Sequence, residues 1–445
     1  KAGSFLRANG GYLVINAFDA LIEPGVWQTL KRALRNGVVD IQVFDPFYIF
    51  STSALKPEPI NVDVKVVMIG NEWLYYLLYY GDEDFKTIFK VKANFDTEMD
   101  KDVKNINNYA SFVKSICQSE NLLPFTKEAI AEIIEYGVRL AGRKDKITTR
   151  FHLIADIIRE ADYWARQRKT TEVDKIDVER AIEGWRKRVN MYEDKIQELI
   201  KKDILMIQTK GKVVGQVNGL SVMQLGDYTF GRPIKITAKT SVGRAGIINI
   251  EREANLAGKT FNKGVLIISG FLRSRYAQDR VLSMDATLGF EQSYSEIDGD
   301  SASSAEIYAI LSALSNVPIK QGIAVTGSVN QNGEIQPIGG VNEKIEGFYE
   351  VCKAKGLTGD QGVIIPKANV NDLMLNQEVV EAVKNKKFHI YAIKDIDEGI
   401  EILTGVKAGK KTKVGFQKKT INYLVEERLK EYAEKLKGEE KKNKR

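Results

Sequence analysis

Apolar and polar positions follow a different spacing in each of three successive parts of the chain. Residues 1–95 combine short apolar runs, typical of buried strands, with amphipathic stretches that end at glycine or at polar residues. We therefore expect an α/β arrangement in this part. The expected elements are strands at 11–16, 38–44 and 64–69 and helices at 23–35 and 72–80.

Residues 96–203 carry apolar positions three or four residues apart with charged faces between them, which predicts a mostly helical region. Thr126 suits the N-cap of one of these helices, because its hydroxyl can accept a hydrogen bond from the first turn. The expected helices span 101–117, 126–141, 149–168 and 175–201.

Residues 204–408 mix both kinds of spacing and predict an α+β domain. The apolar run within 263–278 fits either a strand or a helix, since periodicity alone does not separate the two. The remainder, 409–445, reads as a charged tail whose last part, 435–445, predicts a solvated helix end or a disordered segment. The expected strands are 204–209, 215–225, 234–240, 247–250, 281–290, 363–366 and 388–393. The expected helices are 305–314, 344–355, 379–383 and 395–403.

Composition narrows the class of protein. A length of 445 residues with 43% apolar residues is typical of a globular chain of several domains. No run of about twenty apolar residues occurs, so we expect no membrane span. The first residues do not form a signal peptide, and we expect a cytoplasmic protein. The chain opens on lysine rather than methionine, and we expect it to be a fragment of a longer protein.

Cysteine, histidine and charge add little specific chemistry. Cys117 and Cys352 are too far apart in sequence to suggest a disulfide framework or a metal site. His152 and His389 have no neighbouring signature of a Ser-His-Asp triad, so we expect structural or surface roles. The net charge of +7 comes partly from the tail, which leaves nucleic-acid binding open but favours a role in solubility.

The stretch D-G-D-S-A-S-S-A-E at residues 298–306 carries the first chemical signal. It lies between an expected strand and an expected helix, so Ser301 falls at the helix start or just before it. A helix start offers backbone N–H groups without partners and the positive end of the helix dipole. Both stabilise a neighbouring oxygen that becomes negative during a reaction. The alternative is that aspartate and serine only cap the helix.

A second stretch, 326–344, carries the other signal. It predicts a strand, an Asn-Gly turn, another strand and a glycine pair that opens a helix. Lys344 falls in the first turn of that helix, whereas lysine is more favourable near a helix end. Burial would lower its pKa and leave a neutral amine able to act as a base, as in serine–lysine variants of the triad.

The motif D-G-D-S-A-S, followed by T-G and then by P-I-G-G-V-x-E-K, resembles the proteolytic domain of the Lon protease family, in its LonB-type branch. The resemblance extends from about residue 215 to 405. It implies that Ser301 is the nucleophile and Lys344 the base. It also implies that Thr326 orients the lysine, unless it is an ordinary strand threonine, and that Asp298 positions the loop or tunes the lysine.

Residues 1–203 resemble the second half of an AAA+ ATPase core followed by its helical lid, in a degenerate or truncated form. The positions of the Walker B carboxylates hold Asn16 and Ala17, which cannot replace them in Mg²⁺ chemistry. Asn71 matches one sensor position and Arg150 a second, with a loop residue and a solvated arginine as the respective alternatives. The segment 257–260 only looks like a Walker A motif, and we interpret it as a loop. ATP and Mg²⁺ would then require a P-loop upstream.

These resemblances imply a serine endopeptidase that degrades unfolded proteins inside a homo-hexameric ring. Peptide hydrolysis by Ser301 and Lys344 needs no cofactor or metal. One alternative is a fragment of a full ATP-dependent Lon protease. Another is a catalytically silent chaperone-like or nucleic-acid-binding ring. The expected domains are the partial AAA+ α/β part (1–95), the lid (96–203), the α+β proteolytic domain (204–408) and the tail (409–445).

Overall fold

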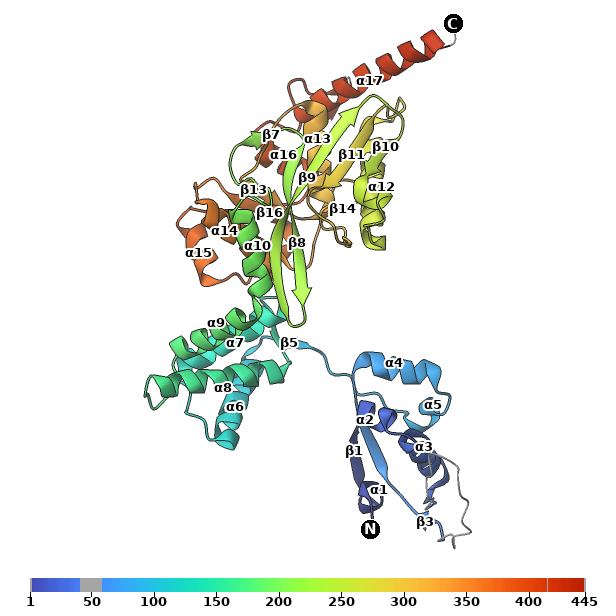
Figure 1. The fold of residues 1–445 in the computed structure, drawn as a ribbon, viewed down its shortest axis with the longest axis vertical. Helices are drawn as coiled ribbons and strands as arrows, with labels where there is room; N and C mark the ends of the chain where they lie inside the picture. The colour runs from blue at the N-terminus through green and yellow to red at the C-terminus, as the bar shows by residue number, and fades with distance from the viewer. Residues whose placement is uncertain (1, 41–57, 414, 444–445) are drawn as a thin grey trace. The chain divides into compact units, whose positions relative to one another are not determined.

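The structure is a computed structural model that describes residues 2–40, 58–413 and 415–443. The described chain forms two compact units, Lys1–Phe95 and Asp96–Arg445 (Figure 1). Within the described ranges, no helix has both the length and the apolar character needed to cross a membrane.

The first unit contains a two-stranded parallel sheet with helices packed beside it. Strands β1 and β4 pair in parallel from Tyr12↔Lys65 to Asn16↔Ile69. Trp27, Leu30, Leu78 and Phe85 form the small core of the unit. The predicted strand 38–44 lies mostly outside the described residues. The elements are α1 (Ser4–Arg7), β1 (Tyr12–Asn16), α2 (Ala17–Ile22), α3 (Val26–Asn36), β2 (Val38–Val39), β3 (Ile60–Asn61), β4 (Lys65–Ile69), α4 (Glu72–Gly81) and α5 (Phe85–Ile88).

The second unit begins with a bundle of helices, as the spacing predicts. Thr126 caps α7 by accepting a hydrogen bond from the Ala129 amide at 3.1 Å. The predicted helix 175–201 is wrong in one respect, because the chain breaks at Asn190 into two helices. The elements are β5 (Glu98–Asp100), α6 (Val103–Glu120), α7 (Lys127–Ala141), β6 (Lys146–Thr148), α8 (Phe151–Gln167), α9 (Lys175–Val189) and α10 (Met191–Lys201).

The remainder of the second unit is built on a seven-stranded mixed sheet of order β10-β11-β9-β8-β13-β16-β17. The strands are β7 (Lys212–Val213), β8 (Gln216–Leu225), β9 (Tyr228–Ser241), β10 (Gly246–Asn249), β11 (Asp285–Phe290), β12 (Ile319–Lys320), β13 (Ile323–Val325), β14 (Ser328–Val329), β15 (Ile335–Gln336), β16 (Gly362–Pro366), β17 (His389–Ile393), β18 (Lys411–Thr412) and β19 (Gly415–Phe416). The helices are α11 (Ile250–Glu253), α12 (Lys259–Tyr276), α13 (Ser303–Ser315), α14 (Val341–Lys355), the 3₁₀ helix η1 (Lys367–Asp372), α15 (Gln377–Lys384), α16 (Ile396–Thr404) and α17 (Ile421–Asn443).

Successive strand residues divide between the two faces of this sheet. Ile323 and Val325 belong to the core that contains α12, α13 and α17, whereas Ala324 belongs to the core that contains α14 and α15. Because side chains alternate along a strand, α13 and α14 must cover opposite faces. The helices that follow the two predicted motifs therefore approach the sheet from different sides.

Two further predictions need correction. Residues 204–209 do not form a strand, because side chains satisfy their backbone instead of a ladder. The Met206 amide donates to Gln292, for example, and the Ile207 carbonyl accepts from Lys355. Residues 409–445 are not simply a charged tail, because Ile421, Val425 and Leu429 of α17 are buried in the core. Their spacing of four residues forms an apolar stripe that the many charges conceal.

The ambiguous run within 263–278 is a helix. It belongs to α12, where Val265, Ile268, Phe271 and Leu272 are buried at intervals of three and four residues. That spacing places their side chains on one face of the helix, which packs into the same core as α13. The helix ends close to the strand that leads toward Ser301.

Candidate active site

Ser301 lies in the loop between β11 and α13, just before Ala302, the N-cap residue of α13. Its carbonyl is fixed at the end of β13. The Gly327 amide donates to it at 2.8 Å, and the Thr326 hydroxyl donates to it at 3.4 Å. These bonds hold the backbone of Ser301 while its hydroxyl remains free to meet another group. The predicted position just before a helix is correct.

Lys344 meets that hydroxyl from the opposite side of the sheet. It lies in the first turn of α14, its side chain is only 2% exposed, and its Nζ donates to Ser301 Oγ at 3.0 Å. The start of α14 packs directly on β9. A Cβ at Gly231 would lie 2.0 Å from the Glu343 carbonyl oxygen, so only glycine permits this approach. The structure brings together the serine and the lysine that the two motifs single out.

The surroundings of Lys344 favour its neutral form. Burial lowers the pKa of the Lys344 amine to about 8, while the negative charges of Asp300 and Glu343 oppose that shift. A lysine with this pKa has an unprotonated fraction near neutral pH. It can therefore accept a proton from a hydroxyl at hydrogen-bonding distance.

Asp300 was not among the predicted site residues. Its carboxylate accepts a hydrogen bond from the Ser328 hydroxyl at 2.7 Å and acts electrostatically on Lys344. Asp298, the predicted aspartate, binds elsewhere. Its Oδ1 accepts from the amides of Thr260 and Phe261 at 3.0 and 3.1 Å. The prediction that Asp298 positions the loop fits these contacts, whereas the carboxylate that influences the lysine is that of Asp300.

Asp298 also contacts the segment 257–260, which resembles a Walker A motif. Gly258 is the N-cap residue of α12, and Lys259 and Thr260 open the helix, so the interpretation as a loop holds only for 257–258. The Asp298 carboxylate accepts hydrogen bonds from N-terminal amides of α12, the kind of group that a phosphate at a helix start would need. The Gly299 amide lowers the pKa of the Asp298 carboxyl most, and the amides of Phe261 and Thr260 lower it further.

Thr326 lies beside the serine, and its predicted role in orienting the lysine stays a prediction. Its side chain is buried, but its hydroxyl bonds to the Ser301 carbonyl rather than to the lysine amine. Thr326 follows β13 directly, and its amide donates to the Ile364 carbonyl of β16. It therefore ties the serine loop to the sheet.

A small cavity opens beside Ser301. Its apolar wall comes from Leu220 of β8, Ile234 and Ile236 of β9, Phe290 and Ile297. Ser301 and Ala302 form part of the same wall. A peptide side chain placed here would contact mainly aliphatic and aromatic groups while its carbonyl lies near Ser301.

The helix that follows the serine carries a buried acid that faces another buried acid. Glu306 of α13 and Glu251 of α11 are both buried. Burial, with a smaller contribution from Glu251, raises the pKa of the Glu306 carboxyl to about 8. Its Oε1 accepts a hydrogen bond from the Asn249 side chain at 3.2 Å. Glu306 is therefore largely protonated at neutral pH, which removes the cost of two adjacent buried charges.

The residues predicted to contact nucleotide are held by the chain itself. Asn71 caps α4 by accepting from the Leu74 amide at 2.8 Å, and Asn16 caps α2 in the same manner. Arg150 precedes α8 and donates to the Leu140 carbonyl at 2.8 Å. Asn71 and Arg150 belong to different compact units. Their contact with nucleotide stays a prediction.

Neither the histidines nor the cysteines contact Ser301 or Lys344 in any described hydrogen bond. His152 is exposed on α8, and His389 shares a hydrogen bond with the Gly359 carbonyl at 2.7 Å. Cys117 and Cys352 are both buried free thiols. In the part of the chain that the structure describes, no group of three or more histidine, cysteine or acidic residues is placed to hold a metal ion.

Comparison with known proteins agrees with this fold. Residues 1–96 match the family described as "LonB-like, AAA domain", and residues 124–188 match "Archaeal LonB, AAA+ ATPase LID domain". Residues 191–405 match "Lon protease (S16) C-terminal proteolytic domain", which includes both Ser301 and Lys344. An AAA-like part, a lid and a proteolytic domain thus follow one another along the chain.

Individual relatives span the same three parts. A "Putative Lon protease homolog" of Escherichia coli is 32% identical over 410 residues, which cover 91% of this chain and 68% of the relative. An "Archaeal Lon protease" of Thermococcus kodakarensis is 30% identical, over 90% of this chain and 60% of the relative. An "Archaeal Lon protease" of Pyrococcus abyssi is 29% identical, over 90% of this chain and 38% of the relative. The chain belongs to the Lon protease family, and it spans about two thirds or less of the length of these relatives.

Proposed function

We propose that this protein is a serine endopeptidase that uses Ser301 as its nucleophile and Lys344 as its general base. The observation that carries the proposal is the 3.0 Å contact between Lys344 Nζ and Ser301 Oγ, made by a lysine that is 2% exposed. The membership of residues 191–405 in the Lon proteolytic family supports it.

In the proposed reaction, the neutral amine of Lys344 takes the proton of Ser301 as Oγ bonds to the scissile carbonyl carbon. Backbone N–H groups at the start of α13 stabilise the resulting oxyanion. The amides of Ser303 and Ser304 already donate to the carbonyls of Asp300 and Gly327, so the amides of Ser301 and Ala302 are our candidates. Lys344 then gives its proton to the leaving amine, the C–N bond breaks, and a water activated by the same lysine hydrolyses the acyl ester.

Unfolded polypeptides are the proposed substrates, and a homo-hexameric ring in the cytoplasm is the proposed assembly. An extended chain can lay a carbonyl against Ser301 and a side chain into the adjacent apolar cavity. Asn16 and Ala17 provide no carboxylate for Mg²⁺ or for an attacking water, so we propose that this chain does not hydrolyse ATP by itself.

The first prediction concerns the dyad. Ser301→Ala and Lys344→Met should each lower the hydrolysis of unfolded casein and of a fluorogenic peptide by about a thousandfold or more, because each removes a reacting group. Ser304→Ala is the matched control. Its hydroxyl is buried without a hydrogen-bond partner, so its loss should leave the rate unchanged.

The assay is run with and without ATP–Mg²⁺ on the pure chain of 445 residues. Cleavage without ATP that both variants lose supports a self-sufficient peptidase. Cleavage that requires ATP would favour the fragment of an ATP-dependent protease. Undiminished cleavage by Ser301→Ala would refute the proposed nucleophile, and inactivity of the parent chain under every condition would favour the chaperone-like or nucleic-acid-binding ring.

A further inference from the structure

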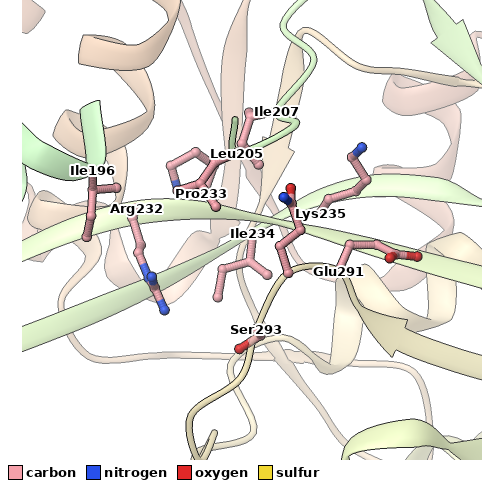
Figure 2. Close-up of a pocket in the computed structure, with 10 residues that line it drawn as sticks. Ile196, Leu205, Ile207, Arg232, Pro233, Ile234, Lys235, Glu291 and Ser293 are labelled. Carbon is pink, nitrogen blue, oxygen red and sulfur yellow. The ribbon is translucent and has the colours of Figure 1, made fainter. Parts of the chain in front are cut away.

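A second cavity lies near the serine site, in the same compact unit (Figure 2). Three segments enclose it: the middle of α10 with the chain that follows this helix, the first half of β9, and the loop after β11. Half of its lining residues are apolar, among them Ile196, Leu205 and Ile234, and the other half are polar or charged. Two lining residues carry a positive charge, and one of them has a buried side-chain nitrogen without a hydrogen-bond partner among the described residues.

That residue is Arg232. Its Nε is buried without a hydrogen-bond partner, and no ion pair of Arg232 occurs among the described residues. Burial lowers the pKa of its guanidinium, with no carboxylate nearby to counteract the effect. The closest acid in the cavity wall, Glu291, accepts a hydrogen bond from Thr237 at 2.7 Å and lies on the far side of Ile234 from the guanidinium in Figure 2.

Two nearby hydroxyl groups are likewise buried without a hydrogen-bond partner in the described part of the chain. Ser293 lines the cavity with Arg232, and its Oγ is buried without a partner. Ser221 lies directly opposite Arg232 in the β8–β9 ladder, so both side chains emerge from the same face of the sheet, and its Oγ is also buried without a partner. All three groups can donate hydrogen bonds, which is the arrangement that an anion requires.

The cavity of Arg232 adjoins the cavity of Ser301. Ile234 lines both cavities, and Ser221 lines the one that contains Ser301. The loop that carries Ser293 continues through Ile297 to the nucleophile. A peptide whose carbonyl lies at Ser301 therefore has a neighbouring group within reach of these three donors.

We propose that Arg232, with Ser221 and Ser293, forms a carboxylate-binding subsite beside the nucleophile. The carboxylate comes either from an acidic side chain of the substrate peptide or from its terminal carboxylate. This inference rests on the proposed peptidase function, because it places the subsite along the same bound peptide. The guanidinium of Arg232 is partly buried and its Nε has no partner, and a bound carboxylate supplies two acceptors for its planar fork.

The test measures binding rather than cleavage, in the Ser301→Ala background. Fluorescence anisotropy follows labelled unfolded peptides in which a single glutamate is moved through the sequence, each beside its glutamine counterpart. A second set compares free C-terminal acids with their amides. We expect at least one glutamate position, or the free acid, to bind about tenfold more tightly than its uncharged counterpart, as suits a charge-assisted pair.

Arg232→Gln should remove this preference and leave the affinity for the uncharged peptides unchanged. Lys239→Gln is the matched control, since it removes one positive charge from an exposed position on the same strand and should retain the preference. Arg232→Gln should also melt at the same or a higher temperature than its parent, because it removes a partly buried charge that has no ion-pair partner among the described residues. Lower affinity could then not be attributed to unfolding.

The two peptide sets separate the two sources of the carboxylate. Discrimination confined to one glutamate position assigns the subsite to an acidic side chain, and discrimination confined to the free acid assigns it to the chain terminus. Equal binding of charged and uncharged peptides by the parent, or equal losses in Arg232→Gln and Lys239→Gln, would overturn the proposal. Neither result would bear on the nucleophile, which the cleavage assay tests separately.

Discussion

At the scale of single residues, the chemistry depends on how far Lys344 is kept from water. Burial is the largest influence on its pKa and lowers it to about 8, whereas Asp300 and Glu343 limit the shift. With this pKa, about a tenth of the lysine is neutral at pH 7 and most of it at pH 9. The two acids thus keep the pKa of the proposed base higher than burial alone would set it.

This balance predicts the pH dependence of cleavage. If neutral Lys344 is required, kcat/KM should rise by about tenfold per pH unit well below the pKa and level off above pH 9 or so. Asp300→Asn removes a charge that raises the pKa, so the midpoint should move to lower pH by about half a unit. The asparagine oxygen can still accept the hydrogen bond from Ser328. Stopped assays of peptide cleavage from pH 6 to 10 give the profile.

Asp227→Asn serves as the control for this experiment. Asp227 is exposed in the turn between β8 and β9, so its charge is screened by solvent and the midpoint should not move. A midpoint that stays in place, or moves to higher pH, in Asp300→Asn would contradict the proposed influence of Asp300 on Lys344.

The sequence could predict the serine and the lysine that the structure brings together, but not the charged residues around them. Lys344 stands out because lysine is unfavourable in the first turn of a helix, and Ser301 stands out because its motif precedes the lysine motif in the order of the Lon family. Asp298 and Asp300 stand two residues apart in one motif, and nothing in the sequence says which of them faces α12 and which influences the lysine. Arg232 carries no local signal at all, because an unpaired charge becomes visible only when all of its neighbours are placed.

At the scale of elements, α14 is connected to the lid as well as to the sheet. Arg139 of α7 forms a two-pronged salt bridge with Glu346 of α14, with N–O distances of 2.8 and 2.6 Å. Glu346 is buried and lies two residues after Lys344. The helix that carries the proposed base is thus fixed in part by a residue more than two hundred positions earlier in the sequence.

Breaking this salt bridge should affect both stability and activity. Arg139→Met leaves the Glu346 carboxylate buried with only the Asn376 amide as a described donor, which should lower the free energy of unfolding by about 3 kcal/mol. We expect kcat/KM to fall as well, because α14 loses a support close to Lys344. Denaturant unfolding and peptide cleavage measure the two effects.

A double variant separates the salt bridge from simple loss of packing. Arg139→Met with Glu346→Met replaces both charges and should recover most of the lost stability. Arg143→Met is the matched control, because Arg143 pairs with Asp145 on the surface, where solvent screens the pair, so its loss should change the stability far less. Equal destabilisation by Arg139→Met and Arg143→Met would contradict this account.

Elements with a clear periodicity were predictable, and those that depend on distant partners were not. The helix after Ser301 and the helix containing Lys344 follow from apolar spacing and a glycine pair. The segment 204–209 has a strand-like pattern, but Gln292 and Lys355 satisfy its backbone from far away in sequence. The helix α17 was obscured because three apolar residues are scattered among many charges.

At the scale of the whole molecule, the proposed active site is confined to one compact unit. Ser301, Lys344, Asp300, Thr326 and Arg232 all belong to the unit that begins at Asp96. This unit contains the two large cores on either side of the sheet and the core of the lid. The first unit has a small core of its own and exposes Tyr12, Val14, Val67 and Ile69 along its two-stranded sheet.

This division predicts that residues 96–445 fold and act without the first unit. The shortened chain should unfold in one cooperative transition and cleave a short fluorogenic peptide with a kcat/KM within about threefold of the full chain, since every proposed reacting group and its supports are retained. Residues 1–95 alone should tend to associate, because parallel sheets are normally covered on both faces and this sheet exposes apolar side chains. Ser301→Ala in the shortened chain is the control for a contaminating peptidase. A folded but inactive 96–445, beside an active full chain, would show that the first unit contributes to the site or to an assembly on which peptide cleavage depends.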